Sequence, residues 1–208
     1  MNTKASFLAL GDSYTIGTYV NESERWPVQL THRLRDIGVS IDNPTIIAEN
    51  GWTTLDLGMA LDEISPESTY DLVSLLIGVN NQYQHLNVDD YRAEFRNLLQ
   101  TSSKLARNDP RRVIVLSIPD WGVTPFAGGK DRQKINSEIE FFNIVNRGEA
   151  EAANALYVDI TPVSRLASEN PSLIASDGLH PSGRMYNMWV ELLVPHALSA
   201  LRGNQHEI

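Results

Sequence analysis

Short apolar runs and longer segments of mixed polarity alternate along the chain. Each apolar run is nearly continuous, which is typical of strands buried on both faces of a sheet. Burial on both faces is in turn characteristic of parallel sheets that are covered by helices. The runs that predict strands are residues 6–10, 45–48, 70–77, 113–118 and 156–160.

The segments between these runs carry apolar residues on the spacing of an amphipathic helix. In the first of them, Leu30 and Leu34 fall on one face and Gly38 follows as a stop signal. Thr53 or Thr54 is suited to cap the second helix, and Pro195 predicts a kink in the last one. The segments that predict helices are residues 26–37, 53 or 54 to 64, 88–107, 134–153 and 184–201.

Strands that alternate with helices predict a parallel sheet with helices on both faces. The expected fold class is therefore α/β: a three-layer α/β/α sandwich with a five-stranded parallel sheet and a flavodoxin-like arrangement. No internal repeat, low-complexity tract or linker interrupts the pattern. Residues 1–208 are accordingly predicted to form a single domain, which is long enough to bury its own core.

Three irregular segments begin at or near the carboxyl ends of predicted strands, at residues 83–87, 119–130 and 164–178. Ligands of open α/β sheets bind in the crevice beyond these ends, so the three segments are candidates for the walls of a cleft. Aromatic residues in such loops serve as plain packing about as often as they line a pocket. The aromatic candidates for substrate binding are Trp52, Tyr83, Trp121 and Phe126.

Composition narrows the classes of protein to which the chain can belong. Its 42% hydrophobic and 21% charged residues are close to globular averages and argue against disorder. A net charge of -9 disfavours binding to nucleic acid or to anionic membrane surfaces, which requires accumulated Lys and Arg. Without cysteine, disulfides, thiolate catalysts and cysteine metal sites are excluded. The expected partner is a small molecule, and the oligomeric state stays open.

Two features of the sequence bear on where the protein is located. The few residues before the first strand hold no apolar run of signal-peptide length. No stretch reaches the ~18 apolar residues of a membrane helix. We therefore expect no integral membrane association and a cytoplasmic location for the chain as written. A periplasmic or secreted location is expected if a leader has been removed.

A serine stands on the turn directly after the first strand, in the sequence Gly11-Asp12-Ser13. The topology of an open α/β sheet places Ser13 where a nucleophile would lie. A serine hydroxyl is a weak nucleophile, so it needs a base within hydrogen-bond reach and a third group that fixes the tautomer of that base. Asp177 and His180, three residues apart on a polar segment, are suited to these two roles.

Each of these signals also has a plain structural explanation. Ser13 alone is suited to a turn, and Asp177 with His180 to a polar loop that caps the last helix. His85 competes for the role of the base, but no carboxylate stands at a fixed spacing to orient it. What favours the catalytic interpretation is that both signals fall at strand-to-helix junctions, one near each end of the chain.

These residues closely resemble the SGNH, or GDSL-like, hydrolase family of serine esterases and lipases, and the resemblance spans the whole chain. It implies that Ser13 is the nucleophile and that Asp177 and His180 are its acid and base. It also implies an oxyanion hole formed by the Ser13 and Gly51 backbone N–H groups and the Asn80 side-chain amide. The matching blocks are Gly11-Asp12-Ser13, Glu49-Asn50-Gly51-Trp52-Thr53, Gly78-Val79-Asn80-Asn81 and Asp177-Gly178-Leu179-His180. Their joint occurrence in this order carries the resemblance.

One position departs from the family pattern. The family usually has aspartate after the asparagine of the third block, and this chain has Asn81. The usual aspartate is not the catalytic acid, so the proposed triad is unaffected. The hydrogen bonds around the oxyanion hole, and with them the substrate preference, are the features that this change puts in question.

The resemblance implies a serine esterase that hydrolyses small or medium acyl esters through an acyl-enzyme and needs neither cofactor nor metal. A lysophospholipase and a carbohydrate acetylesterase are alternatives within the family. From another class, a flavin- or phosphate-binding flavodoxin-like module would use the hydroxyl-rich run of residues 13–18, but it leaves Asp177 and His180 without a role. A relative that binds ligand without catalysis is disfavoured by the intact triad residues.

Overall fold

The computed structural model describes residues 4–64 and 68–202 of the chain. Within them, five parallel strands form a sheet in the order β2-β1-β3-β4-β5. The strands are β1 (Phe7–Gly11), β2 (Thr45–Ala48), β3 (Leu72–Leu76), β4 (Val113–Leu116) and β5 (Leu156–Val158). The α-helices are α1 (Ser13–Ile16), α2 (Trp26–Asp36), α3 (Thr54–Ile64), α4 (Val79–Tyr83), α5 (Val88–Leu105), α6 (Arg132–Ala152), α7 (Thr161–Arg165) and α8 (Gly183–Arg202). The 3₁₀ turns are Glu22–Glu24, Pro110–Arg112, Trp121–Val123, Pro125–Ala127, Leu166–Ser168 and Pro171–Leu173.

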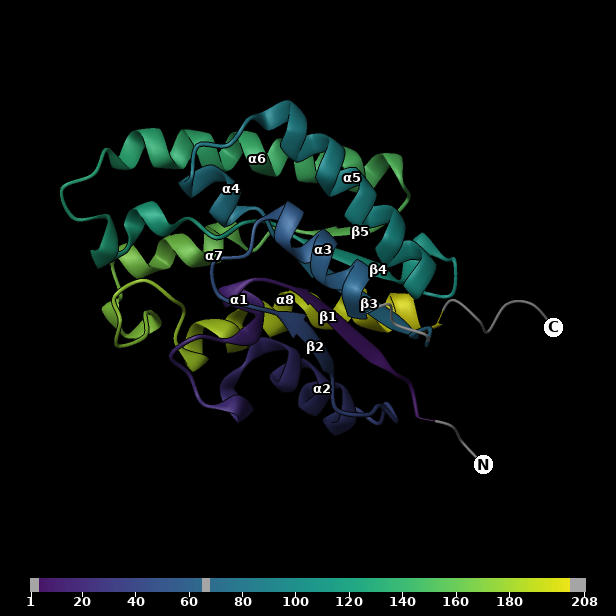
Figure 1. Cartoon of the computed structure of the whole chain (residues 1–208). Coiled ribbons are helices and arrows are strands. Elements are labelled where there is room, and N and C mark those ends of the chain that lie inside the picture. Colours follow the sequence, from purple (N-terminus) through teal and green to yellow (C-terminus); the bar gives the residue numbers. More distant parts are fainter. Residues whose placement is uncertain (1–3, 65–67, 203–208) are drawn as a thin grey trace.

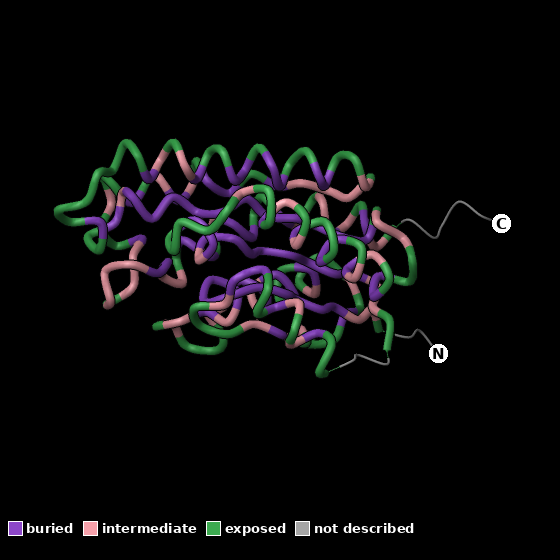
Figure 2. The backbone as a smooth tube through the Cα atoms, turned by 45° about the horizontal axis from the view of Figure 1, so that its top comes forward, coloured by how far each residue is buried: buried purple, intermediate pink, exposed green. Residues whose placement is uncertain are grey.

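Helices cover both faces of the sheet (Figure 1). α2 packs against α8 on one face, and α5 packs between α3 and α6 on the other. In Figure 2 the buried backbone runs through the middle of the three layers, whereas the outer turns of the helices are exposed. The largest fully buried side chains are Trp26, Trp189, Tyr91, Tyr186, Phe7 and Phe95. This is the three-layer α/β/α sandwich that the alternating pattern predicts.

The register of the central strands determines where the motif blocks of the sequence lie. β1 lies between β2 and β3, and Gly11 at its end pairs with Ala48 of β2 and with Leu76 of β3. The carboxyl ends of the three strands therefore meet at one edge of the sheet. The segments that follow them, which carry three of the four motif blocks, start side by side at that edge.

The strands are shorter than the apolar runs that predict them, because polar groups take over the backbone hydrogen bonds at their ends. The N–H of Ile118 donates to Asn143 Oδ1 (2.7 Å), so β4 stops before the end of its run. The N–H of Ile160 donates to Ser117 Oγ (2.8 Å), and β5 stops likewise. At the start of β3, the N–H of Tyr70 donates to the Leu105 carbonyl at the end of α5 (2.7 Å).

The long helices lie where helical spacing predicts them. α6 begins at Arg132, before the predicted start, because Asp131 caps it by accepting a hydrogen bond from the Lys134 N–H (3.0 Å). At the start of α3 the cap is Thr53, whose Oγ1 accepts from the Asp56 N–H (3.3 Å). α8 continues through Pro195 as one helix. The short helices α1, α4 and α7 are not predicted by the pattern.

None of the helices in the described part of the chain is long and apolar enough to cross a membrane. The single-domain interpretation of residues 1–208 and the location of the chain stay predictions.

Candidate active site

Ser13 is the first residue of α1, directly beyond the end of β1, and is buried. The turn into this helix is very tight. A Cβ atom at Gly11 would lie 2.2 Å from Thr15 Oγ1 and 2.5 Å from the Leu76 carbonyl oxygen, so only glycine fits there. The Asp12 side chain caps the helix by accepting a hydrogen bond from the Tyr14 N–H (3.0 Å). The first two residues of the Gly11-Asp12-Ser13 block thus fix the position of the third.

A chain of hydrogen bonds joins Ser13, His180 and Asp177. Ser13 Oγ lies 2.9 Å from His180 Nε2, and His180 Nδ1 lies 2.5 Å from Asp177 Oδ2. The other carboxylate oxygen, Asp177 Oδ1, accepts hydrogen bonds from the backbone N–H groups of Leu179 and His180 (3.1 Å each). With the Nδ1 proton directed at Asp177, Nε2 is left to accept the Ser13 hydroxyl proton.

Asp177 is held in the ionised form. Burial by itself would raise the pKa of this carboxyl, but the hydrogen bond from His180 and those from the two backbone N–H groups outweigh it. The net effect places the pKa of Asp177 below its ordinary value. A negative charge therefore stays beside the imidazole ring.

Two tyrosines flank the imidazole of His180. The Tyr14 ring lies 5.2 Å from the His180 ring between centroids. Tyr19, which is 66% exposed, stacks on the same ring at 6.4 Å with 20° between the planes. Neither contact has a signal in the sequence, because both tyrosines follow Ser13 closely along the chain whereas His180 is distant.

The residues expected to form the oxyanion hole lie on the segments that follow β2 and β3. Asn80, in α4, donates one N–H of its amide to the Trp52 carbonyl (2.9 Å), which leaves the second for a ligand. Gly51 has a φ of +83°, a conformation that favours glycine, and its backbone N–H donates to no other described residue. The N–H of Ser13 is also unpaired within the described residues.

A cavity of about 130 Å³ opens at Ser13. Three of the four aromatic candidates line it, namely Tyr83, Trp121 and Phe126. The fourth, Trp52, is not among its lining residues: its side chain packs against the core, and its carbonyl holds Asn80. The residues around the cavity are Ser13, Tyr14, Val79, Asn80, Tyr83, Trp121, Phe126, Leu179 and His180.

Asn81 does not line the cavity and instead binds Thr54, the first residue of α3. Its Oδ1 accepts from the Thr54 N–H (3.0 Å), and its Nδ2 donates to Thr54 Oγ1 (2.7 Å). The Thr54 hydroxyl in turn donates to Glu94 Oε2 (2.5 Å). An aspartate in place of Asn81 would compete with Glu94 for this hydroxyl proton. Asparagine at this position is therefore matched to Glu94 on α5.

His85 does not reach the proposed nucleophile. Its side chain is 68% exposed, and its Nδ1 lies 3.9 Å from Glu138 Oε2. It lines a neighbouring cavity and not the one at Ser13. Among the described residues, no group of three or more His, Asp or Glu side chains is arranged to hold a metal ion.

The carboxyl of Asp12 is buried directly before Ser13. Burial raises its pKa from 3.8 to about 7, and hydrogen bonds from backbone N–H groups, including that of Tyr14, oppose the rise only in part. A carboxyl with this pKa changes its charge near neutral pH, next to the proposed nucleophile.

The comparison with known families agrees with this geometry. The sequence profile of the GDSL-like Lipase/Acylhydrolase family matches residues 9–188, which is most of the chain. The chain belongs to this family, and it is a carboxylic ester hydrolase. The resemblance drawn from the four sequence blocks is thereby confirmed. No match is found among curated proteins.

Three of the solved structures that are similar to this chain are described here. TesA has a TM-score of 0.71 at 19% identity, with 94% of this chain and 99% of that chain covered. The psychrotrophic esterase EstA from Pseudoalteromonas sp., inhibited by monoethylphosphonate, has a TM-score of 0.74 at 14% identity, with 96% and 100% covered. Axe2, an acetylxylan esterase from Geobacillus stearothermophilus, has a TM-score of 0.66 at 19% identity, with 95% and 94% covered. At these identities the likeness shows the fold, and the predicted α/β sandwich is confirmed.

We predict that Asp12→Asn becomes more stable relative to the wild type as the pH rises. The folded-state pKa of about 7 lies above the ordinary 3.8, so this carboxyl stabilises the fold while it is protonated. That contribution is complete below the ordinary pKa and is lost as the pH rises through the folded one. The relative gain should reach at most about 4 kcal/mol. Urea unfolding of both proteins at about pH 5 and about pH 8 measures the difference in their free energies of unfolding. A difference that is the same at both pH values would contradict the prediction.

We predict that alanine substitution lowers catalysis at Asn80 and stability at Asn81. Asn80→Ala should lower kcat by about 10²–10³, the usual loss for one preorganised oxyanion donor. Asn81→Ala should lower the free energy of unfolding by about 1–3 kcal/mol, because the buried Thr54 N–H loses its acceptor. Asn81→Asp keeps that acceptor and should affect kcat far less than Asn80→Ala. Ester hydrolysis and urea unfolding of the three variants test this, and a loss of kcat in Asn81→Asp equal to that in Asn80→Ala would contradict it.

Proposed function

We propose that this hydrolase cleaves carboxylic esters of small or medium acyl groups through an acyl-enzyme on Ser13. The observation that carries the proposal is the continuous hydrogen-bonded chain from Ser13 through His180 to Asp177 at the edge of a cavity. A hydroxyl, an imidazole and an ionised carboxyl in this geometry form an activated nucleophile.

The first half of the reaction forms the acyl-enzyme. His180 Nε2 takes the proton from Ser13 as Oγ attacks the ester carbonyl carbon. The charge that develops on the carbonyl oxygen is stabilised by the N–H groups of Ser13 and Gly51 and by the Asn80 amide. Asp177 stabilises the imidazolium that forms. As the carbon–oxygen bond to the alcohol breaks, His180 returns the proton to the leaving oxygen.

The second half repeats these steps with water. His180 takes a proton from a water molecule, whose oxygen attacks the acyl carbon and displaces Ser13 Oγ. The carboxylic acid leaves, and Ser13 regains its proton from His180. The imidazole must therefore be neutral at the start of each half.

The size of the cavity supports a short acyl group. Its volume of about 130 Å³ is well below the roughly 300–1,000 Å³ of sites for drug-sized ligands. The walls are largely aromatic, so each methylene that they cover contributes up to ~0.8 kcal/mol, and chain length stops helping once the cavity is full.

Two other substrate classes could use the same catalytic residues, and the size of the cavity separates them. A carbohydrate acetylesterase is the second candidate, because an acetyl group fits a small cavity and acetylxylan esterases are among the similar structures. A lysophospholipase requires room for a long acyl chain, which the cavity at Ser13 does not provide. A flavin- or phosphate-binding module would leave the hydrogen-bonded chain unexplained.

We predict that kcat/KM for 4-nitrophenyl esters rises with acyl length over the short chains and then falls, since a filled cavity excludes further methylenes. Ser13→Ala should abolish turnover of every ester in the series. The release of 4-nitrophenol measures both, and the thermal unfolding of Ser13→Ala confirms that the variant is folded. A steady rise to long-chain esters in micelles would favour the lysophospholipase, and full activity in Ser13→Ala would refute the proposed nucleophile.

A further inference from the structure

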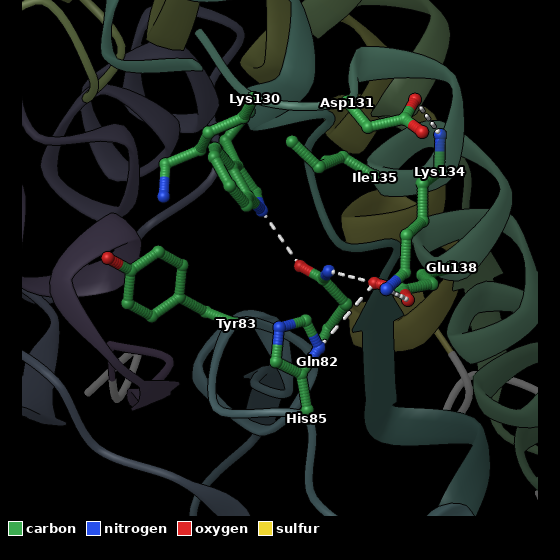
Figure 3. Close-up of a pocket in the computed structure, with 9 residues that line it drawn as sticks. Gln82, Tyr83, His85, Lys130, Asp131, Lys134, Ile135 and Glu138 are labelled. Carbon is green, nitrogen blue, oxygen red and sulfur yellow. Dashed lines mark hydrogen bonds and ion pairs between the residues drawn. The ribbon is translucent and has the colours of Figure 1, made fainter. Parts of the chain in front are cut away.

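A second, larger cavity adjoins the one at Ser13. It has a volume of about 430 Å³ and shares two walls, Tyr83 and Trp121, with the catalytic cavity. Figure 3 shows Lys130 and Tyr83 on one side of this second cavity and Lys134 and Glu138 on the opposite side. Its lining residues are Gln82, Tyr83, His85, Trp121, Lys130, Asp131, Lys134, Ile135 and Glu138.

The wall between the two cavities is held in place by one buried and one partly buried hydrogen bond. The indole N–H of Trp121 donates to Gln82 Oε1 (2.8 Å), and Gln82 Nε2 donates to Glu138 Oε2 (2.7 Å). Both Trp121 and Gln82 are buried. The position of the indole, and with it the boundary of the catalytic cavity, is thereby fixed from α4 and α6.

The acidic groups of the second cavity are already engaged within the protein. Glu138 accepts from Gln82 and lies 3.7 Å from Lys134 Nζ and 3.9 Å from His85 Nδ1. Asp131 Oδ1 accepts the Lys134 N–H at the start of α6. The charges of these two carboxylates are therefore offset by cations or by the helix terminus.

Lys130 differs from these two carboxylates because its charge is not offset. No ion pair joins it to another residue in the described part of the chain. Its ammonium lies over the rings of Tyr83, Trp121 and Phe126, at 5.4, 5.7 and 5.9 Å from the centroids. Contacts of this kind hold a cation in place without neutralising it. All three rings line the catalytic cavity, and Lys130 itself lines the second cavity, which shares Tyr83 and Trp121 with the first.

The direction of attack decides which part of a substrate meets this charge. The leaving alcohol must lie against His180, because His180 protonates it. The acyl group extends from the other side of the carbonyl carbon, toward the walls that do not include His180. Tyr83 and Trp121 form such a wall, and an acyl group that extends past them into the second cavity meets Lys130, whose ammonium lies over both rings.

Resting on the esterase activity proposed above, we propose that Lys130 binds an anionic group at the far end of the acyl chain. The substrates would then include monoesters of dicarboxylic acids, whose free carboxylate pairs with the Lys130 ammonium while the ester carbonyl lies at Ser13. The chain as a whole carries a net charge of -9, which repels an anionic substrate. The preference therefore depends on the local positive charge of Lys130.

The test compares two esters of equal acyl length, mono-4-nitrophenyl glutarate and 4-nitrophenyl valerate. They share a leaving group and differ in one terminal carboxylate. Lys130→Gln should lower the glutarate-to-valerate ratio of kcat/KM by roughly two- to fivefold, the effect of a partly exposed ion pair. Lys130→Glu should lower the ratio further. The loss should appear as a higher KM for the glutarate ester, because the pair forms in the ground state as well as in the transition state.

Lys104→Gln is the matched control. It removes the same charge at the end of α5, where Lys104 shares a surface with Ala152 and Ala153 at the far end of α6, a helix about 30 Å long. Its ratio should equal that of the wild type, and the wild-type ratio should fall with added salt. An unchanged or higher ratio in Lys130→Gln would overturn the anionic subsite while leaving the esterase intact. If the wild type hydrolyses neither these esters nor 4-nitrophenyl acetate, the proposed esterase function itself fails.

Discussion

The hydrogen bond between Ser13 Oγ and His180 Nε2 is the contact on which the site depends, and it joins residues 167 positions apart. Ser13 is fixed by the end of the central strand β1. His180 is fixed separately, because Ile174 pairs with Pro181 and the Ala175 N–H donates to the His180 carbonyl (2.7 Å). The two groups meet because the loop of residues 174–181, held by its own hydrogen bonds, places His180 beside the turn that follows β1.

Local patterns were sufficient to predict the sheet, the long helices and the family. Continuous apolar runs mark strands buried on both faces, and helical spacing marks α2, α3, α5, α6 and α8. The short helices α1, α4 and α7 were missed, because a helix of one turn is unstable by itself and forms only where its surroundings hold it. The strand ends were overestimated for a related reason: Asn143 and Ser117 capture backbone groups that an apolar run assigns to the sheet.

Within the site, the sequence predicts the three residues of the proposed triad but not most of the residues that position them. Ser13, Asp177 and His180 have a pattern of their own, and the structure brings them into hydrogen-bond distance. Gln82, Glu138 and Lys130 have none, because their roles arise from contacts between α4, α6 and the segment before α6. From the sequence, Asn81 puts the hydrogen bonds around the oxyanion hole in question. In the structure it binds Thr54, whose hydroxyl donates to Glu94, and its amide fits there better than a second carboxylate.

The central claim, an activated Ser13, is tested most directly by covalent labelling. A fluorophosphonate probe should add one phosphonyl group to the wild-type protein, and mass spectrometry of its peptides should place that group on Ser13. Labelling should be much slower in His180→Ala, since the hydroxyl then loses its base. A label on another serine, or equal labelling rates with and without His180, would contradict the account.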